Sequence, residues 1–332
     1  MSDRAGSRWA WPPRRWPGGL AWGLWALTLG GLAGTVWLDR LLRQDGFPEL
    51  AFLGGGNVTF AMAALSAATV GAVVAGRRPA HPVGWLLVAL GLTISALAVT
   101  FSSTRYGLVA RPGALPAADY LAGFATGAIF LTLSCAGFVL LLTPTGALPS
   151  PRWRWWARAE LVAVAVAFLS SALSPQPLYP EYPEIGNPLG VQALADGPLA
   201  AALPFGALLI LAGLPAGAVS LLLRFRRARG LERLQLRWLM VGAMLAALAL
   251  VVSLTALAVE SDGYVFQAAL GVCVSILPLA TGAAILRYRL YDLDRIVSRT
   301  LAYGLLTVLL GGGYTLVVLG LGQLLGRDSS LV

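Results

Sequence analysis

Few side chains in this sequence could carry out chemistry. The 332 residues include one histidine, two cysteines and no lysine, so all 24 basic residues are arginines. Without lysine the chain cannot build a Walker A phosphate loop, a Schiff base or a lysine nucleophile. The sequence also offers no Ser/His/Asp set and no cluster of metal ligands. We therefore predict a protein that is not an enzyme, with no catalytic residue, no metal and no cofactor.

The histidine and the cysteines have ordinary interpretations. His81 lies in a short polar connection and could titrate near neutral pH, but a polar loop residue is the simpler interpretation. Cys135 and Cys273 lie deep in apolar stretches, far from a histidine or a third cysteine. There they are expected to pack as small apolar residues.

The composition indicates that these residues are held by membrane-spanning helices. Hydrophobic residues make up 58% of the chain, charged residues only 12%, and the mean hydropathy is +0.75. A soluble fold could not bury that much apolar surface, whereas a helix of about 20 apolar residues crosses a bilayer. The runs are continuously apolar rather than alternating, which favours an all-α polytopic membrane protein over a barrel. We predict nine transmembrane helices, near residues 18–38, 51–76, 82–104, 119–143, 157–174, 199–223, 237–259, 264–286 and 300–325.

The charges predict an orientation for these spans. With the N-terminus in the cytoplasm and the C-terminus outside, 19 of the 24 arginines fall in inner segments and 10 of the 15 acidic residues in outer ones. This is the asymmetry expected at a cell membrane, so the net charge of +9 indicates anionic lipid headgroups rather than nucleic acid as partners. The predicted division is a cytoplasmic Arg/Trp-rich segment over 1–17, a transmembrane domain over 18–326 and a short tail over 327–332, a truncation point in this interpretation.

The spans themselves look free of charge. Every Asp, Glu and Arg is expected at or beyond a span end, with Glu160 at the start of the fifth span, which Pro175 cuts short. Ion pumps, ion-coupled transporters and voltage sensors need charges within the membrane, so these classes are disfavoured, whereas transport of a neutral substrate stays open.

Glycines and prolines recur within the spans. Glycines four residues apart predict close helix packing, and Pro204, Pro215 and Pro278 predict kinks in the sixth and eighth spans. The glycine pairs are Gly19/Gly23, Gly30/Gly34, Gly123/Gly127, Gly213/Gly217 and Gly322/Gly326. One such pair could also join two copies of the chain.

One outer loop could bind an external ligand. Residues 175–198 contain six prolines, two tyrosines, three acidic residues and no arginine. Prolines stiffen the backbone into extended segments, and tyrosines offer apolar contact. The candidate ligand surface is Tyr179, Glu181, Tyr182 and Glu184. The alternative is a rigid connector between two spans.

Two inner segments could act at the cytoplasmic face. Residues 224–238 hold six arginines, which would attract anionic headgroups or simply set the topology. Residues 286–300 place apolar residues on one helical face and charges on another, as in an interfacial helix. Such a helix could relay movement or serve as an anchor. The candidate relay residues are Arg289, Tyr291, Asp292, Asp294, Arg295 and Arg299.

The segment Leu286-Arg-Tyr-Arg-Leu-Tyr-Asp-Leu-Asp-Arg-Ile-Val-Ser-Arg-Thr-Leu-Ala-Tyr-Gly304 resembles the junction in multi-pass membrane sensor proteins of actinobacteria and related bacteria, many of them sensor histidine kinases. Four other stretches resemble the same group in the same order. They are Arg77-Arg-Pro-Ala-His-Pro-Val-Gly-Trp-Leu-Leu87, Leu142-Thr-Pro-Thr-Gly-Ala-Leu-Pro-Ser-Pro-Arg-Trp153, Asn187-Pro-Leu-Gly190 and Arg229-Gly-Leu-Glu-Arg-Leu-Gln-Leu-Arg-Trp238.

The resemblance implies the membrane input part of a signalling protein. The chain departs from the group at His81, where Asn is usual, and at Thr145, where Asp is usual. The group typically continues after a position like Gly326 into a further span and cytoplasmic GAF and kinase domains, whereas this sequence holds no phosphoacceptor box and no ATP-binding motif. The predicted function is therefore a non-catalytic sensor module, partnered by a second copy or by a kinase. The alternatives are a transporter or lipid-handling protein for a neutral substrate, and a membrane scaffold.

Overall fold

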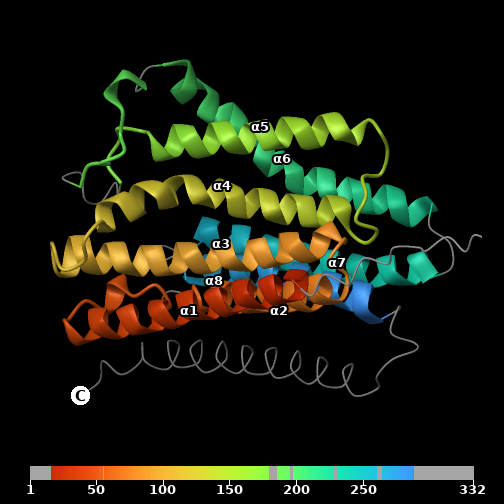
Figure 1. Cartoon of the computed structure of the whole chain (residues 1–332), viewed down its shortest axis with the longest axis horizontal. Coiled ribbons are helices and arrows are strands. Elements are labelled where there is room, and N and C mark those ends of the chain that lie inside the picture. Colours follow the sequence, from red (N-terminus) through yellow and green to blue (C-terminus); the bar gives the residue numbers. More distant parts are fainter. Residues whose placement is uncertain are drawn as a thin grey trace, which may run out of the picture.

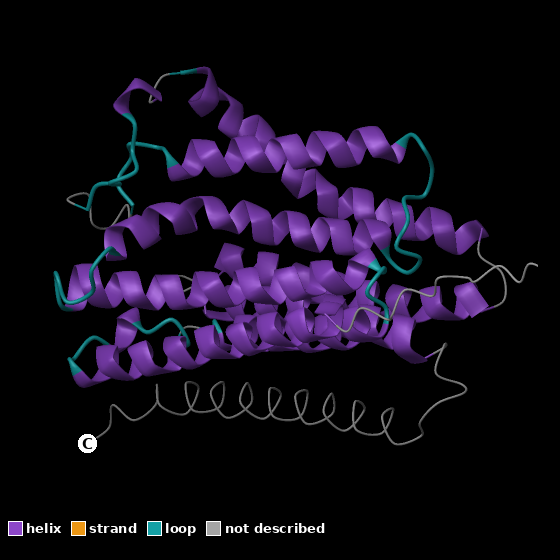
Figure 2. Cartoon of the chain, in the orientation of Figure 1, coloured by secondary structure: helices purple, strands orange, loops and turns teal. Residues whose placement is uncertain are grey.

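The computed structural model describes residues 16–54, 56–178, 185–194, 197–227, 231–259 and 264–287, and in these ranges every regular element is helical (Figure 2). Three short turns of helix lie among the long ones: η1 (Pro48–Leu50), η2 (Arg105–Ala110) and η3 (Gln192–Leu194). The long helices are α1 (Trp16–Gln44), α2 (Val58–Arg77), α3 (Pro82–Thr104), α4 (Ala118–Leu142), α5 (Trp153–Ala172), α6 (Pro198–Arg227), α7 (Leu231–Val259) and α8 (Tyr264–Arg287).

The long helices form one bundle in which consecutive helices run antiparallel (Figure 1). Helix α2 packs against α1, α3 and α8, and α8 packs against α7. Helix α4 covers α3 and carries the pair α5 and α6 on its other side. The three helices α4, α5 and α6 contact one another, and this three-helix unit holds the candidate site described below.

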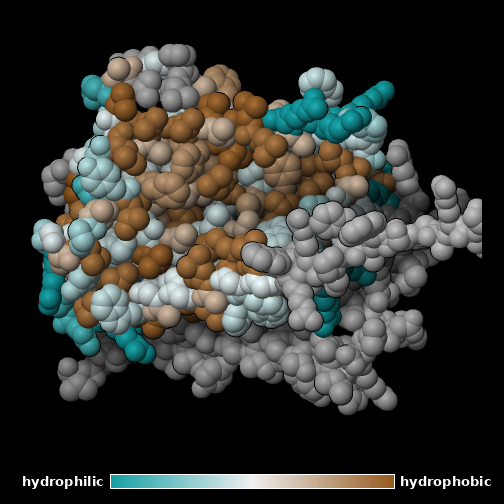
Figure 3. All heavy atoms as spheres, viewed as in Figure 1, coloured by the Kyte–Doolittle hydropathy of each residue, from teal (hydrophilic) through white to brown (hydrophobic). Residues whose placement is uncertain are grey.

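Among the described residues, seven helical segments are long and apolar enough to cross a membrane: α1, α2, α3 continued by η2, α4, α5, α6 and α8. On the face drawn in Figure 3, hydrophobic residues cover the middle of the bundle, and hydrophilic ones gather towards the two ends of the helices. Large apolar side chains such as Phe205 and Met244 are more than two-thirds exposed, as expected for a surface in contact with lipid. The prediction of an all-α polytopic membrane protein is thus confirmed in its coarse form.

Small residues let the central helices approach closely. A Cβ atom at Gly71 of α2 would lie 2.5 Å from the backbone nitrogen of Val88 on α3, and one at Gly91 would lie 2.6 Å from the carbonyl oxygen of Ala64. Ala63, Ala64 and Ala67 are completely buried in the same contact. Because lipid is as apolar as the helices, such close van der Waals packing holds a membrane bundle together.

The loops gather at two opposite ends of the bundle (Figure 1). The end that we call the arginine-rich end holds the loops over 78–81 and 143–152 and the last turn of α6; Arg77, Arg152, Arg154 and Arg226 lie there. The opposite end holds the loops over 45–57, 111–117 and 173–197, of which 55, 179–184 and 195–196 lie outside the described residues. This separation is the one that the sequence predicted from alternating spans.

The predicted start of the second span was wrong. The second span was expected from residue 51, but α2 begins at Val58, because Gly56 turns the chain at a φ of +90°. A Cβ there would lie 2.6 Å from the carbonyl oxygen of Tyr264, so glycine is required on both grounds. Helices α6 and α8 are each continuous through their prolines, so the kinks predicted at Pro204, Pro215 and Pro278 would leave each span as one helix. The ninth predicted span, the N-terminal segment over 1–15 and the tail lie outside the described residues.

Candidate functional site

A buried carboxylate lies at the centre of the three-helix unit. Glu160 is the eighth residue of α5, and only 1% of it is exposed. The prediction that no acidic residue lies inside a span is therefore wrong. The apolar run in the sequence begins at residue 157, whereas the helix begins at Trp153, so Glu160 lies two turns inside the helix.

Two glycines on the neighbouring helices make room for this carboxylate. A Cβ atom at Gly137 of α4 would lie 2.9 Å from the Oε1 atom of Glu160, and one at Gly213 of α6 would lie 2.6 Å from it. A larger residue at either position would force the carboxyl group of Glu160 to move. The carboxylate of Glu160 on α5 therefore fits only because the facing positions on α4 and α6 are the glycines Gly137 and Gly213.

The carboxylate is poorly paired. Its Oε1 atom accepts a hydrogen bond from Oγ of Ser134 on α4 at 3.3 Å. Its Oε2 atom and Nε1 of Trp156, one turn earlier on α5, are both buried without a hydrogen bond of good geometry among the described residues, and the indole N–H is the one donor besides Ser134 that interacts with this carboxyl group. An ionised carboxylate without a countercharge costs several kcal/mol to bury. Within a membrane span, an acidic residue kept at such a cost marks a functional position.

A continuous seam between α4 and α6 leads from Glu160 to the arginine-rich end. Gly213, Gly217, Ser220 and Arg224 share one face of α6, because they are spaced by four, three and four residues. A Cβ at Gly217 would lie 2.6 Å from the Cβ of Leu140 on α4. The predicted close packing of Gly213 and Gly217 is thus confirmed, and its partner is α4.

Two polar residues extend the seam towards the arginine-rich end. The hydroxyl of Ser220 donates a hydrogen bond to the carbonyl oxygen of Leu141 at 3.4 Å. One turn later, the guanidinium of Arg224 donates to the same carbonyl at 3.1 Å and to Oγ1 of Thr145 at 2.6 Å. It also donates to the carbonyl oxygen of Ala147. Arg224 therefore fastens the end of α6 to the loop that leaves α4.

The loop before α3 joins the same place. Nε2 of His81 lies 3.1 Å from the carbonyl oxygen of Pro144, within hydrogen-bonding distance. Gly146, at a φ of +78°, passes so close that a Cβ would lie 2.9 Å from Cδ of Pro82. Two of the stretches that resemble sensor proteins, 77–87 and 142–153, thus meet at one junction. We call His81, Pro144, Thr145, Ala147 and Arg224 the loop junction.

A second buried carboxylate serves a different purpose at the opposite end. Asp39 of α1 is 3% exposed, and its Oδ1 atom accepts hydrogen bonds from Oγ of Ser102 at 2.7 Å and from the backbone nitrogen of Phe52 at 3.0 Å. Its Oδ2 atom accepts one from the backbone nitrogen of Leu53 at 2.7 Å. With three donors this carboxylate is satisfied, and it anchors the loop after α1 to α3.

Two further side chains, Arg111 and Asn187, fix the loops at the same end. Arg111 pairs with Asp45 at 2.6 Å, and this hydrogen bond raises the pKa of the Arg111 guanidinium. Asn187, in another of the resembling stretches, donates to the carbonyl oxygens of Ala172 and Ser174 at 2.9 and 2.8 Å. A Cβ at Gly123 of α4 would lie 2.5 Å from its Oδ1 atom. Asn187 thus holds the loop after α5 against α4.

The residues predicted as sites lie elsewhere in the chain. The candidate ligand surface of Tyr179, Glu181, Tyr182 and Glu184 and the candidate relay of Arg289, Tyr291, Asp292, Asp294, Arg295 and Arg299 lie outside the described residues, so both stay predictions. Within the part of the chain that the structure describes, no three His, Cys, Asp or Glu side chains gather as metal ligands.

Comparison with protein-family models, with curated proteins and with solved structures finds no match to this chain.

Proposed function

We propose that the protein is a non-catalytic signal-input module of the bacterial cell membrane, with its arginine-rich end in the cytoplasm. The observation that carries the proposal is the loop junction. Stretches 60 to 80 residues apart in the sequence meet there through His81, Thr145 and Arg224. Two of the five stretches that carry the resemblance to sensor proteins, 77–87 and 142–153, are in contact there. Such a contact would let these loops move together.

The seam supplies a route for such movement. A switch requires an element with two arrangements and a group whose interactions differ between them. Glu160 is such a group, because one of its oxygens lacks a hydrogen bond of good geometry among the described residues and its environment is tight on both sides. A change in what the carboxylate binds would alter the spacing of α4 and α6, and Ser220 and Arg224 would carry that change to the loop junction.

A chimera tests this proposal. The full chain would be joined, through one added spanning helix, to a histidine kinase output domain, because nine predicted spans place the chain end outside. Autophosphorylation would then be measured in vesicles under osmotic, pH and cationic-peptide stress. We expect at least one stress to change the output severalfold. An output that stays constant under every stress contradicts the proposal.

Two arginines at the same end of α6 provide a matched pair of variants. Arg224→Gln removes the hydrogen bonds to the loop junction and should uncouple the output from the stress, whereas Arg226 is exposed, so Arg226→Gln should leave the response intact. Equal loss in both variants would mean that only the total charge of this end matters.

Transport is the second candidate, and Glu160 is the observation that favours it. An acidic residue within a span is common to proton relays and substrate pathways, so the sequence-based argument against ion-coupled transport no longer holds. Uptake into proteoliposomes, driven by a proton gradient and abolished by Glu160→Gln, would support this candidate over the first.

A further inference from the structure

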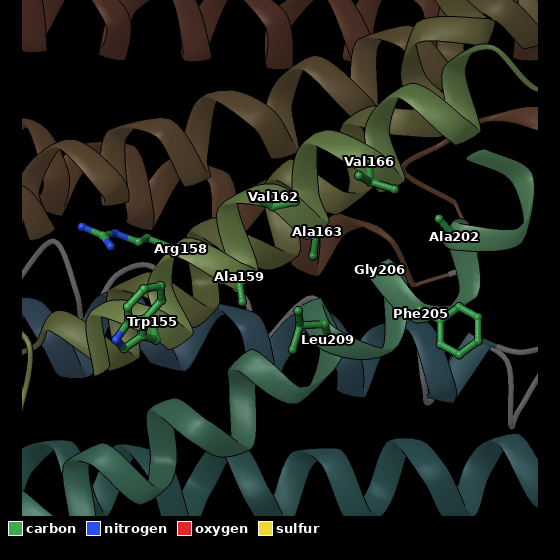
Figure 4. Close-up of a pocket in the computed structure, with 10 residues that line it drawn as sticks. All are labelled: Trp155, Arg158, Ala159, Val162, Ala163, Val166, Ala202, Phe205, Gly206 and Leu209. Atoms are coloured by element: carbon green, nitrogen blue, oxygen red, sulfur yellow. The ribbon is translucent and has the colours of Figure 1, made fainter. Parts of the chain in front are cut away.

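An open groove runs along the outer face of α5 and α6. It has a volume of about 480 Å³, and its lining includes Ala159, Val162, Phe205 and Leu209 (Figure 4). Gly206 brings the two helices together at its floor, because a Cβ there would lie 3.2 Å from the carbonyl oxygen of Ala163. The groove faces the surroundings of the bundle, because Trp155, Val162 and Phe205 in its lining are more than half exposed.

The two ends of the groove differ in character. Trp155 and Arg158 lie at one end, and Val166, Ala202 and Phe205 lie at the other (Figure 4). The guanidinium carbon of Arg158 lies 5.3 Å from the centre of a Trp155 ring, which is a cation–π contact. Arg158 is the one charged residue in the lining. A ligand of this groove would therefore be apolar over most of its length and negatively charged at the end near Trp155.

The length of the groove matches one leaflet of a bilayer. From Trp155 to Val166 the helix advances about 16 Å at ~1.5 Å per residue. The hydrocarbon of one leaflet is about 15 Å thick, half of the ~30 Å core. Trp155 and Arg158 lie near the start of α5, at the arginine-rich end, where the headgroups of that leaflet would be. An acyl chain entering between Trp155 and Arg158 would reach Phe205 near the middle of the membrane.

We propose that this groove binds one anionic phospholipid, with an acyl chain between α5 and α6 and its phosphate against Arg158. The site is independent of the signal-input proposal, because it uses the outer face of α5 and no residue of the seam. The arginine-rich loops should attract anionic lipids in general, whereas this site would hold one lipid at Arg158.

Native mass spectrometry of the full chain tests the site. Protein purified in a neutral detergent would be incubated with equal amounts of phosphatidylglycerol and phosphatidylcholine that carry the same acyl chains. We expect one phosphatidylglycerol to be retained per chain in preference to phosphatidylcholine. Arg158→Gln should lower the affinity for phosphatidylglycerol about fivefold, the equivalent of ~1 kcal/mol, and leave phosphatidylcholine unchanged.

Neighbouring positions on α5 provide the controls. Arg154 is exposed and outside the lining, so Arg154→Gln should retain the preference. Ala159 lies in the groove and Ala165 is exposed outside it, so Ala159→Phe should prevent retention of either lipid while Ala165→Phe should not. These residues are at the surface, and unchanged thermal unfolding would verify that each variant folds.

Three results would overturn the proposal. Equal losses in the two arginine variants would indicate diffuse charge attraction. Lipid retention unaffected by Ala159→Phe would place the acyl chain elsewhere. If Ala159→Phe instead changes the mass of the particle from two chains to one, the groove is the contact between copies of the protein.

Discussion

Glu160 on α5 and Ser134 on α4 form a hydrogen bond of 3.3 Å between Oε1 and the hydroxyl, while the second carboxylate oxygen is buried without a hydrogen bond of good geometry among the described residues. Because of this arrangement, replacing Glu160 should affect the stability of the protein and its signalling response differently. A buried carboxyl group with few hydrogen-bond partners is costly to keep in its charged form, so a neutral amide of the same shape should not lower stability. Glu160 is therefore not needed for stability, and we expect its replacement to change the signalling response instead.

The first prediction concerns Glu160 itself. Glu160→Gln keeps the shape of the side chain and removes its charge, so the midpoint of thermal unfolding in detergent should stay the same or rise. The stress response of the kinase chimera should disappear in the same variant. Ser134→Ala, which removes the one hydrogen bond to Oε1, serves as the comparison and should weaken the response. A normal response in Glu160→Gln would show that the carboxylate has no signalling role.

The second prediction concerns the glycine that accommodates the carboxylate. Gly213→Ala places a Cβ 2.6 Å from Oε1, so it should destabilise the protein by about 1–3 kcal/mol, the usual cost of overpacking. Gly23→Ala on α1 is the control, because nothing lies within 4 Å of its Cβ position. Combining Gly213→Ala with Glu160→Ala should restore much of the loss, since the colliding atoms are gone. Additive effects in the double variant would contradict the assigned contact.

The third prediction concerns Asp39. Its carboxylate accepts hydrogen bonds from one hydroxyl and two backbone N–H groups, so Asp39→Ala leaves one buried and two partly buried donors without this partner. Each unpaired donor costs about 1–3 kcal/mol, and we expect a large loss of stability in chemical unfolding. Glu49→Gln, an exposed change in the same loop region, should have little effect. Equal stability of the two variants would disprove the anchoring role of Asp39.

The fourth prediction concerns pH. Pairing with Asp45 raises the pKa of the Arg111 guanidinium, so the stabilisation is fully present below the unfolded-state pKa and is lost only as the pH rises through the raised folded-state pKa, in strongly alkaline solution. Arg111→Gln should therefore shift the unfolding midpoint by the same amount at pH 6 and at pH 9. A shift that grows or vanishes between these two values would mean that another group controls the pair.

Much of the architecture follows from hydropathy alone. The first eight predicted ranges each correspond to a helix, because runs of about 20 apolar residues have no other way to satisfy their backbone groups in a bilayer. Boundaries were less accurate where apolar residues lie in turns, as before Val58, or where a helix extends beyond the apolar run, as at Trp153.

The candidate site illustrates what hydropathy cannot provide. Glu160 looks like an interfacial residue in sequence, because Arg158 and three tryptophans lie close before it. Its burial depends on Gly137 and Gly213, which are 23 residues before it and 53 residues after it. The spacing of Gly213, Gly217, Ser220 and Arg224 does mark one face of α6 in the sequence, but its partner on α4 emerges only from the packing.

The sidedness of the two ends is the central claim, because a signal-input module must present its loop junction to the cytoplasm. Cys135 and Cys273, the two cysteines of the chain, would be replaced by alanine, and single cysteines introduced by Ala147→Cys at the loop junction and Ala114→Cys at the opposite end. Both positions are exposed. In intact cells, a membrane-impermeant maleimide should label Ala114→Cys and leave Ala147→Cys unlabelled until the membrane is opened. Labelling of both positions in intact cells, or of Ala147→Cys alone, would contradict the account.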